Sequence, residues 1–446
     1  MSEGNHNDGD GGDGGRRSSR RGKRSSSSRD DDNSAVADYS TEEMRFYRNR
    51  DRDVRRKIAD TENMIRTLNN DDTPLRFKVL LSELDDSVKA MAMKKVNSLA
   101  GMDSGSSYQK VLQWVEALCR LPIGKYNALP IGPDAPRADI GAFLKGLRAT
   151  LDERVYGHED AKGHVVRLLA QWITTPAAKG LVIGLHGPPG VGKTELCKVV
   201  CEVIGMPFAF VPLGGANDGC YIDGHSYTYE GATWGKIADV LMKNGCMNPV
   251  LFFDELDKVS DTSRGREIIN LLVHLTDSTQ NDRFNDKYFL DVELDLSKCL
   301  VIFSYNDESK LNPILRDRIT RVETEGYSTK DKVEIARKHL LPGMLAQFAM
   351  DRPLRLDDAV IRYVVESVEA EKGVRNLKRA LHDVVSNMHF EQLMAHLPPR
   401  EKADAADKEE KEQQGAIVVT TEHVDRYVKT ARRDKISKET LLSMYS

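Results

Sequence analysis

The sequence contains few cysteines and no paired arrangement of them. The six thiols are Cys119, Cys197, Cys201, Cys220, Cys246 and Cys299, and none belongs to a C-x-x-C motif. Cys197 and Cys201 are four residues apart, but no histidine or further cysteine stands nearby to complete a metal site. Free thiols are typical of a reducing compartment. We therefore expect an intracellular protein, cytoplasmic or, as the alternative, nuclear.

Long apolar runs and a dominant charge of one sign are also lacking. No run approaches the roughly 18–20 apolar residues that cross a bilayer, and the N-terminal segment has no apolar core of a secretory signal. We therefore expect no membrane partner. The formal net charge of −4, with 30% charged residues, indicates neither a strongly basic nucleic-acid surface nor an acidic tail protein. The 446 residues suffice for two or three domains.

The N-terminal segment, residues 1–38, consists of Gly, Asp, Ser and Arg with almost no apolar content. Such a composition cannot offset the entropy of ordering by burial, so it predicts a disordered tail. Residues 16–24 form a basic block within it. The block is either part of a solvated tail, the interpretation we adopt, or an arm for nuclear import or nucleic-acid binding.

Residues 39–128 predict a helical N-terminal module. Apolar residues recur there at steps of three and four, first in Leu80, Leu81, Leu84, Val88 and Met91, and then in Val111, Leu112, Val115, Leu118 and Cys119. A turn at residues 101–107 separates the two runs. Residues 128–138, with three prolines, predict a linker.

Residues 139–326 alternate short apolar runs with amphipathic helices. The apolar runs, which predict buried parallel strands, are residues 181–186, 208–213, 250–253 and 300–304. This alternation predicts an α/β three-layer sandwich with a parallel sheet. Residues 327–430 return to helices, at 330–341, 357–371 and 374–395, with one short strand at 416–420, and predict a small helical domain. Residues 431–446 remain as a C-terminal tail.

A phosphate-binding motif follows the first predicted strand. The pattern G-x-x-x-x-G-K-T is formed by Gly187, Pro188, Pro189, Gly190, Val191, Gly192, Lys193 and Thr194. Glycines allow backbone N–H groups to surround phosphates, and the following helix adds the positive end of its dipole. We expect Lys193 to reach the β- and γ-phosphates of ATP and Thr194 to place its hydroxyl on Mg²⁺.

Two carboxylates, Asp254 and Glu255, end the predicted strand at residues 250–253. We expect this strand to lie beside the one that precedes the phosphate motif, so that Asp254 holds Mg²⁺, directly or through water. Glu255 then orients the attacking water, because phosphoryl transfer depends on positioning and charge neutralisation. The alternative, a strand end capped by solvated acids, is common where no phosphate motif is present.

Three further polar residues are candidates for the same site. Asn306 follows the strand at 300–304 and is either a partner of the attacking water or γ-phosphate, or a turn residue. Arg318 is either solvated or an arginine finger that faces a neighbouring subunit's nucleotide. Arg375 opens a helix after Gly373, and it is equally well interpreted as a surface residue or as a residue of the site.

Together these motifs resemble the AAA+ ATPase module of the Lon protease family. The resemblance runs from about residue 80 to residue 428. Besides the phosphate motif it includes Leu213-Gly214-Gly215, Gly224-His225, Asp254-Glu255-Leu256-Asp257-Lys258, Gly326-Tyr327, and Gly373-Val374-Arg375-Asn376-Leu377. It implies a P-loop AAA+ domain followed by a helical lid and preceded by a helical module.

The resemblance also implies residue roles and an assembly. Asn306 matches sensor 1, Arg318 the arginine finger, and Arg375 sensor 2 of the lid, while Tyr156 lies where the family's adenine-pocket segment lies. Members of the family use Mg-ATP to pull polypeptides through the pore of a six-membered ring. The resemblance therefore implies a homo-hexamer with a polypeptide substrate.

Two departures qualify that expectation. Tyr229 matches the pore-loop aromatic residue, but Glu230 follows it where the family usually has an aliphatic residue. The family's protease domain would begin near residue 430, so we expect an unfoldase without peptidase activity, acting alone or with a separate protease or adaptor. The alternatives are a nucleic-acid-associated AAA+ ATPase, which the acidic pore loop disfavours, and a regulatory scaffold that binds ATP without turnover.

Overall fold

The computed structural model describes residues 39–69, 73–103, 105–175, 182–216, 218–290, 292–348, 350, 353–394 and 415–428. The basic block at 16–24, both predicted tails and most of the segment between 394 and 416 lie outside them. The chain divides into two compact units, Met1–Pro74 and Leu75–Ser446. The first contains helices α2 (Thr41–Arg48) and α3 (Arg52–Asn69), and a capping box between Ser40 and Glu43 begins α2.

Three helices open the second unit: α4 (Leu75–Leu81), α5 (Asp86–Leu99) and α6 (Ser106–Arg120). The apolar run from Leu80 to Met91 is helical, as its spacing indicates, but it is divided between α4 and α5. Asp85 is the N-cap of α5 and has the extended backbone conformation of that position, at which Asp is a preferred residue. Leu81 is consequently 76% exposed, whereas Leu84 is buried. The predicted boundaries of the helical module, 39–128, stay a prediction.

A parallel five-stranded sheet forms the centre of the second unit, which confirms the predicted α/β fold class. Its order is β2-β3-β6-β1-β7. The strands are β1 (Val182–His186), β2 (Phe208–Pro212), β3 (Val250–Asp254), β6 (Leu300–Tyr305) and β7 (Thr320–Glu323). Strand β7 was not predicted, because Val322 is its only fully buried residue and a single apolar position gives no pattern.

The expectation that the strand carrying Asp254 lies beside β1 is wrong. Strand β6 lies between β1 and β3 and pairs with both. Two parallel strands that pair are joined by a long crossover connection. The apolar pattern of each strand does not say which other strand it pairs with, so the strand order could not be predicted from it. The polar residues that end β6 thereby stand between the phosphate motif and Asp254.

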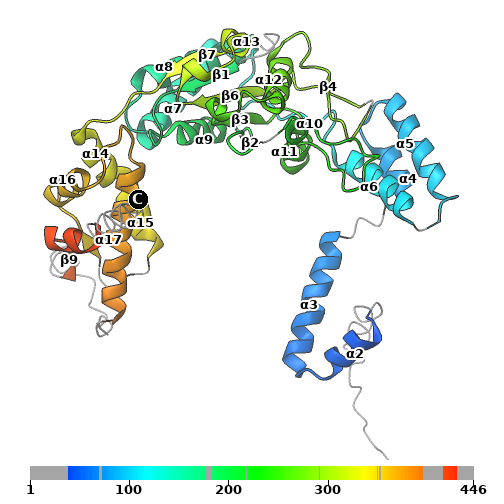
Figure 1. The fold of residues 1–446 in the computed structure, drawn as a ribbon, viewed down its shortest axis with the longest axis horizontal. Helices are drawn as coiled ribbons and strands as arrows, with labels where there is room; N and C mark the ends of the chain where they lie inside the picture. The colour runs from blue at the N-terminus through cyan, green and yellow to red at the C-terminus, as the bar shows by residue number, and fades with distance from the viewer. Residues whose placement is uncertain are drawn as a thin grey trace, which may run out of the picture. The chain divides into compact units, whose positions relative to one another are not determined.

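Helices cover both faces of the sheet (Figure 1). Alternate strand residues face opposite sides, so Phe252 packs with α7 (Arg137–Arg154), α8 (Glu159–Thr174) and α9 (Lys193–Val203). Phe253 instead packs in the core that includes α10 (Cys220–Asp223), α11 (Lys236–Asn244), α12 (Ser263–Thr276) and helices α4–α6. Burial on both faces explains why these strands read as continuous apolar runs.

The lid, from Thr329 onward, has its own apolar core. Its elements are α14 (Thr329–Ile335), the π-helical turn η3 (Ala336–Leu340), α15 (Leu341–Gln347), β8 (Leu354–Arg355), α16 (Asp358–Ser367), α17 (Arg375–Met394) and β9 (Ile417–Val418) (Figure 1). Helix α15 continues from the π-helical turn, and Pro342 lies directly after that turn. Among the helices described here, none is long and apolar enough to span a membrane.

Candidate functional site

The loop between β1 and α9 requires glycine at three positions. Gly187, Gly190 and Gly192 have φ values of 154°, 78° and 91°, which only glycine adopts without strain. A Cβ on Gly187 would lie 2.2 Å from the backbone oxygen of Thr324. Gly192 is the N-cap of the 11-residue helix α9, so the free N–H groups of the first turn point into this loop. The loop can therefore surround an anion with backbone donors.

The ammonium group of Lys193 lies at the centre of this loop. Its Nζ donates to the carbonyl oxygens of Gly187 (2.6 Å) and Tyr305 (3.2 Å) and to Oδ1 of Asn306 (2.6 Å). The Lys193 side chain is buried. The structure thus brings Lys193 and Asn306 together. The oxygen atoms that now accept from the Lys193 ammonium would be replaced by phosphate oxygens when a nucleotide binds.

Burial lowers the pKa of Lys193 to about 8, although the carboxylates of Asp254 and Asp257 act in the opposite direction. Bound phosphate would favour the charged ammonium and raise this pKa. At pH 8 nucleotide binding should therefore take up about half a proton, and the affinity for nucleotide should fall as the pH rises above 8. Calorimetry in two buffers of different ionisation enthalpy measures this uptake. Binding without proton uptake at that pH would contradict the assignment of Lys193 to the phosphates.

The two carboxylates after β3 have different surroundings. Asp254 accepts a hydrogen bond from the hydroxyl of Ser304, which lies on the intervening strand β6. Glu255 is exposed and has a φ of 59°, a left-handed conformation that is unusual for a residue other than glycine and recurs at functional sites. A Cβ on Gly214 would lie 2.1 Å from the Glu255 carboxylate, so the glycine leaves space for that side chain.

These residues fit a nucleoside triphosphate with Mg²⁺. The loop offers backbone donors and one buried cation, and Thr194 follows Lys193 in the first turn of α9. The described part of the chain contains no cluster of three or more His, Cys, Asp or Glu side chains that could hold a metal. Thr194 and Asp254 would therefore hold Mg²⁺ jointly with phosphate oxygens and water, the ligands that this ion prefers.

The lid contacts the phosphate loop directly. The Val374 N–H donates to the Gly190 oxygen (3.1 Å), and a Cβ on Gly373 would lie 2.3 Å from the Pro189 oxygen. The Glu371 carboxylate accepts the Asn376 N–H (2.6 Å) in the first turn of α17. Arg375, which the sequence alone leaves open between a surface residue and a site residue, therefore stands at the start of α17 against Gly190.

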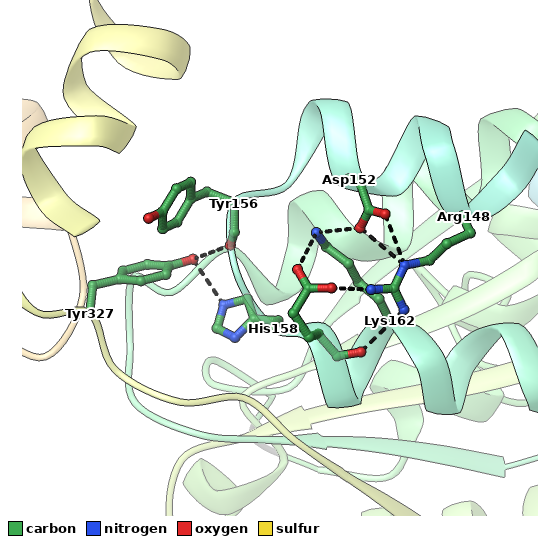
Figure 2. A network of polar contacts seen from close by, with 7 residues as sticks. Arg148, Asp152, Tyr156, His158, Lys162 and Tyr327 are labelled. Carbon is green, nitrogen blue, oxygen red and sulfur yellow. Dashed lines mark hydrogen bonds and ion pairs between the residues drawn. The ribbon is translucent and has the colours of Figure 1, made fainter. Parts of the chain in front are cut away.

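Three aromatic residues surround the backbone of the same loop. The hydroxyl of Tyr327 and Nε2 of His158 both lie within hydrogen-bond distance of the Val191 oxygen (2.7 and 2.8 Å) and 2.9 Å from each other. Tyr156 packs edge-on against Tyr327 (Figure 2), and the Tyr156 hydroxyl donates to Asp331 (3.0 Å). Burial lowers the pKa of His158, which favours its neutral form. His158 and Tyr327 were not among the predicted site residues: the Gly326-Tyr327 motif carried no predicted role, and a single histidine in a loop has no pattern.

An ion-pair cluster lies beside these residues and fixes the start of α8 (Figure 2). Lys162 is only 1% exposed, and its Nζ contacts Asp152 (2.9 Å) and Glu159 (3.5 Å). Arg148 pairs with both carboxylates. A buried charge persists only when paired, so the cluster holds the segment at 156–158 in one conformation.

Arg318 has partners outside the phosphate loop. Asn312 caps the short helix α13 (Pro313–Arg318), with Pro313 at its first position. Arg318, at its end, donates to the Val273 oxygen (3.0 Å) and pairs with Asp277 (3.0 Å). The hydrogen bonds from Thr279 and this arginine hold the pKa of Asp277 at about 2.

Tyr229 and Glu230 lie in the loop between α10 and α11. The His225 N–H donates to the Thr233 oxygen (3.0 Å) and closes the loop, while the Tyr229 N–H donates to Ser226 (3.1 Å) and makes its turn. Tyr229 is 69% exposed, and Glu230 is exposed as well. The loop therefore presents an aromatic and an acidic side chain to solvent.

Residues 183–327 match the family described as "ATPase family associated with various cellular activities (AAA)". The chain is 34% identical over 342 residues to the Lon protease homolog of Acanthamoeba polyphaga mimivirus, which covers 75% of this chain and 33% of that protein. It is 36% identical to the Lon protease of Desulfovibrio desulfuricans (67% of this chain, 32% of that protein) and 33% identical to Lon protease 1 of Bacillus subtilis (69% and 38%). The chain thus spans about a third of the length of these relatives.

Proposed function

Since the chain contains an AAA ATPase module of the Lon type, we propose that it binds ATP with Mg²⁺ and couples hydrolysis to the remodelling of polypeptides. The observation that carries this proposal is the contact of the Lys193 ammonium with Asn306 inside the glycine loop. One buried cation and one amide face the position of the γ-phosphate there. The module is that of an ATPase, so the proposed activity is remodelling rather than peptide-bond cleavage.

The residues of this chain divide the catalytic work. Lys193 and the N–H groups of the loop bind the phosphates, and Mg²⁺, when held by Thr194 and Asp254, supplies charge neutralisation. Glu255 orients and polarises the attacking water, and Asn306 positions it against the γ-phosphate. Arg375, brought to the loop by the lid, stabilises charge on the phosphates, and Tyr156 lies beside the base.

We propose further that the chain works as a homo-hexamer in an intracellular, reducing compartment, alone or with a separate protease or adaptor. The six cysteines are free, and the relatives bear the name Lon protease. The exposed Tyr229 supports polypeptide as the substrate, since an aromatic ring offers sequence-tolerant apolar contact at low entropic cost.

The test of polypeptide remodelling is ATP-dependent loss of fluorescence from a stable reporter protein that carries an unstructured tail. The wild type should unfold this reporter and should show an ATPase rate that rises with an unfolded polypeptide. Tyr229→Ala should keep the basal ATPase rate and lose both effects. A wild type whose ATPase ignores polypeptide, or a Tyr229→Ala variant that unfolds the reporter normally, would refute the proposal.

Arg318→Ala should reduce ATPase activity at least about 100-fold, since an arginine finger contributes roughly 10³-fold or more to turnover. The loss should be rescued when the variant is mixed with Lys193→Ala subunits. Lys193→Ala subunits have no working phosphate loop, but they still present Arg318 to a neighbour. ATPase assays across mixing ratios measure the rescue. Loss without rescue would show that Arg318 acts within its own subunit, through Asp277, and not across an interface.

A further inference from the structure

A lysine of the N-terminal helices lies between two aromatic rings, one of which belongs to the exposed loop at residues 224–235. Lys95, on α5, places its Nζ 4.5 Å from the ring centre of Trp114 and 4.1 Å from that of Tyr227. The same ammonium donates to the Tyr227 hydroxyl at 2.9 Å. The two rings are tilted, with centroids 6.2 Å apart. An ammonium between two ring faces is bound by both, because each face carries negative potential.

This contact joins parts of the chain that are far apart in sequence. Trp114, on α6, is 1% exposed, and its indole N–H donates to the Tyr288 oxygen at 2.8 Å. Trp114 is therefore held in one position, and Lys95 and Tyr227 pack against its ring. A second lysine, Lys110 on α6, donates to the backbone oxygen of Thr228 at 3.5 Å. Helices α5 and α6 thus contact the two residues that precede Tyr229.

The base of the loop is held separately, from within the AAA domain. The buried carboxylate of Asp286 accepts a hydrogen bond from the Gly235 N–H at 2.8 Å. The ring of Trp234 stacks on that of Phe289, with 6.5 Å between the ring centroids. A Cβ on Gly224 would lie 2.7 Å from the Gly235 nitrogen, so the two ends of the loop are in close contact. These contacts fix where the loop begins and ends. The tip lies beyond them, where Tyr227 and Thr228 contact helices α5 and α6.

We infer that Lys95 is a positioning residue for the exposed loop: it ties the loop tip to helices α5 and α6 and thereby orients Tyr229 toward a polypeptide. The inference rests on the proposed function, because it assigns the loop a polypeptide ligand. An ordered loop binds more tightly than a mobile one, since less conformational entropy is lost on binding. Lys95 acts through Tyr227 and takes no part in ATP chemistry.

The test compares Lys95→Met, which keeps the length and loses the charge, with Lys95→Arg, which keeps a cation for the two rings. Lys94→Met, at the exposed neighbouring position on α5, is the matched control. The polypeptide concentration that half-maximally stimulates ATPase should rise at least about fivefold in Lys95→Met, with basal ATPase unchanged. Lys95→Arg should restore most of the affinity, and Lys94→Met should match the wild type. An unchanged half-maximal concentration in Lys95→Met would overturn the inference.

Amide hydrogen exchange of residues 225–233 in the full chain gives a reading that needs no polypeptide. Exchange there should accelerate in Lys95→Met and not in Lys94→Met, and protection equal to wild type would overturn the inference. If exchange accelerates but wild-type ATPase ignores polypeptide, the proposed function fails while the attachment of the loop stands. The two failures are thus distinguishable.

Discussion

Lys193→Ala is expected to weaken nucleotide binding at least about 100-fold, because the loop loses its only buried cation among the described residues that line it. The phosphates would then meet backbone N–H groups and the lid's Arg375, with no ammonium inside the loop. Titration with a fluorescent ATP analogue measures the change. The fold should persist, since the sheet and both of its cores do not depend on this side chain.

The matched control for this prediction is Lys198→Ala, which removes an exposed lysine from the same helix. It should bind nucleotide as the wild type does. Circular dichroism during heating checks that both variants fold. A Lys193→Ala variant that is folded and binds nucleotide with wild-type affinity would refute the assignment of residues 187–194 to the phosphates.

Glu255→Gln is expected to bind ATP within about twofold of wild type yet to turn it over at least about 100-fold more slowly. The amide retains the size of the side chain and its place beside Gly214. It loses the charge that polarises water, a contribution of typically 10²–10⁴-fold in general base catalysis. Phosphate release in the steady state gives turnover, and analogue titration gives affinity.

Glu116→Gln, an exposed carboxylate on α6, is the control for general loss of charge. It should leave turnover unchanged. Normal turnover in Glu255→Gln would assign water activation to another group. Equal loss of affinity and turnover would instead mean that Glu255 supports binding of the nucleotide and has no separate role in its hydrolysis.

The sequence predicts those parts of the site that are contiguous and repetitive in pattern. Residues 187–194 form one motif, and Asp254 and Glu255 directly follow an apolar run that is buried on both faces of the sheet. The strands β1, β3 and β6 are predictable for the same reason. Their local composition alone dictates burial.

The remaining features depend on contacts between distant segments. The insertion of β6 beside β1, and with it the hydrogen bond from Ser304 to Asp254, follows from strand order. His158 and Tyr327 reach the Val191 oxygen from separate loops, so the linear sequence does not show that they meet there. The pairing of Lys95 with Tyr227 spans 132 positions. Tertiary packing decides such contacts.

The backbone contact between Gly373 and the phosphate loop couples the position of helix α17, which starts two residues later, to the conformation of that loop. Neither glycine has a side chain at this point, so the two backbones meet directly and a movement of Gly190 toward Gly373 has to displace it. Helix α17 has 20 residues and is therefore about 30 Å long. A small rotation of the helix about its start is largest at its far end, near Met394. We therefore expect an adjustment of the phosphate loop around a bound nucleotide to reach the lid through this contact.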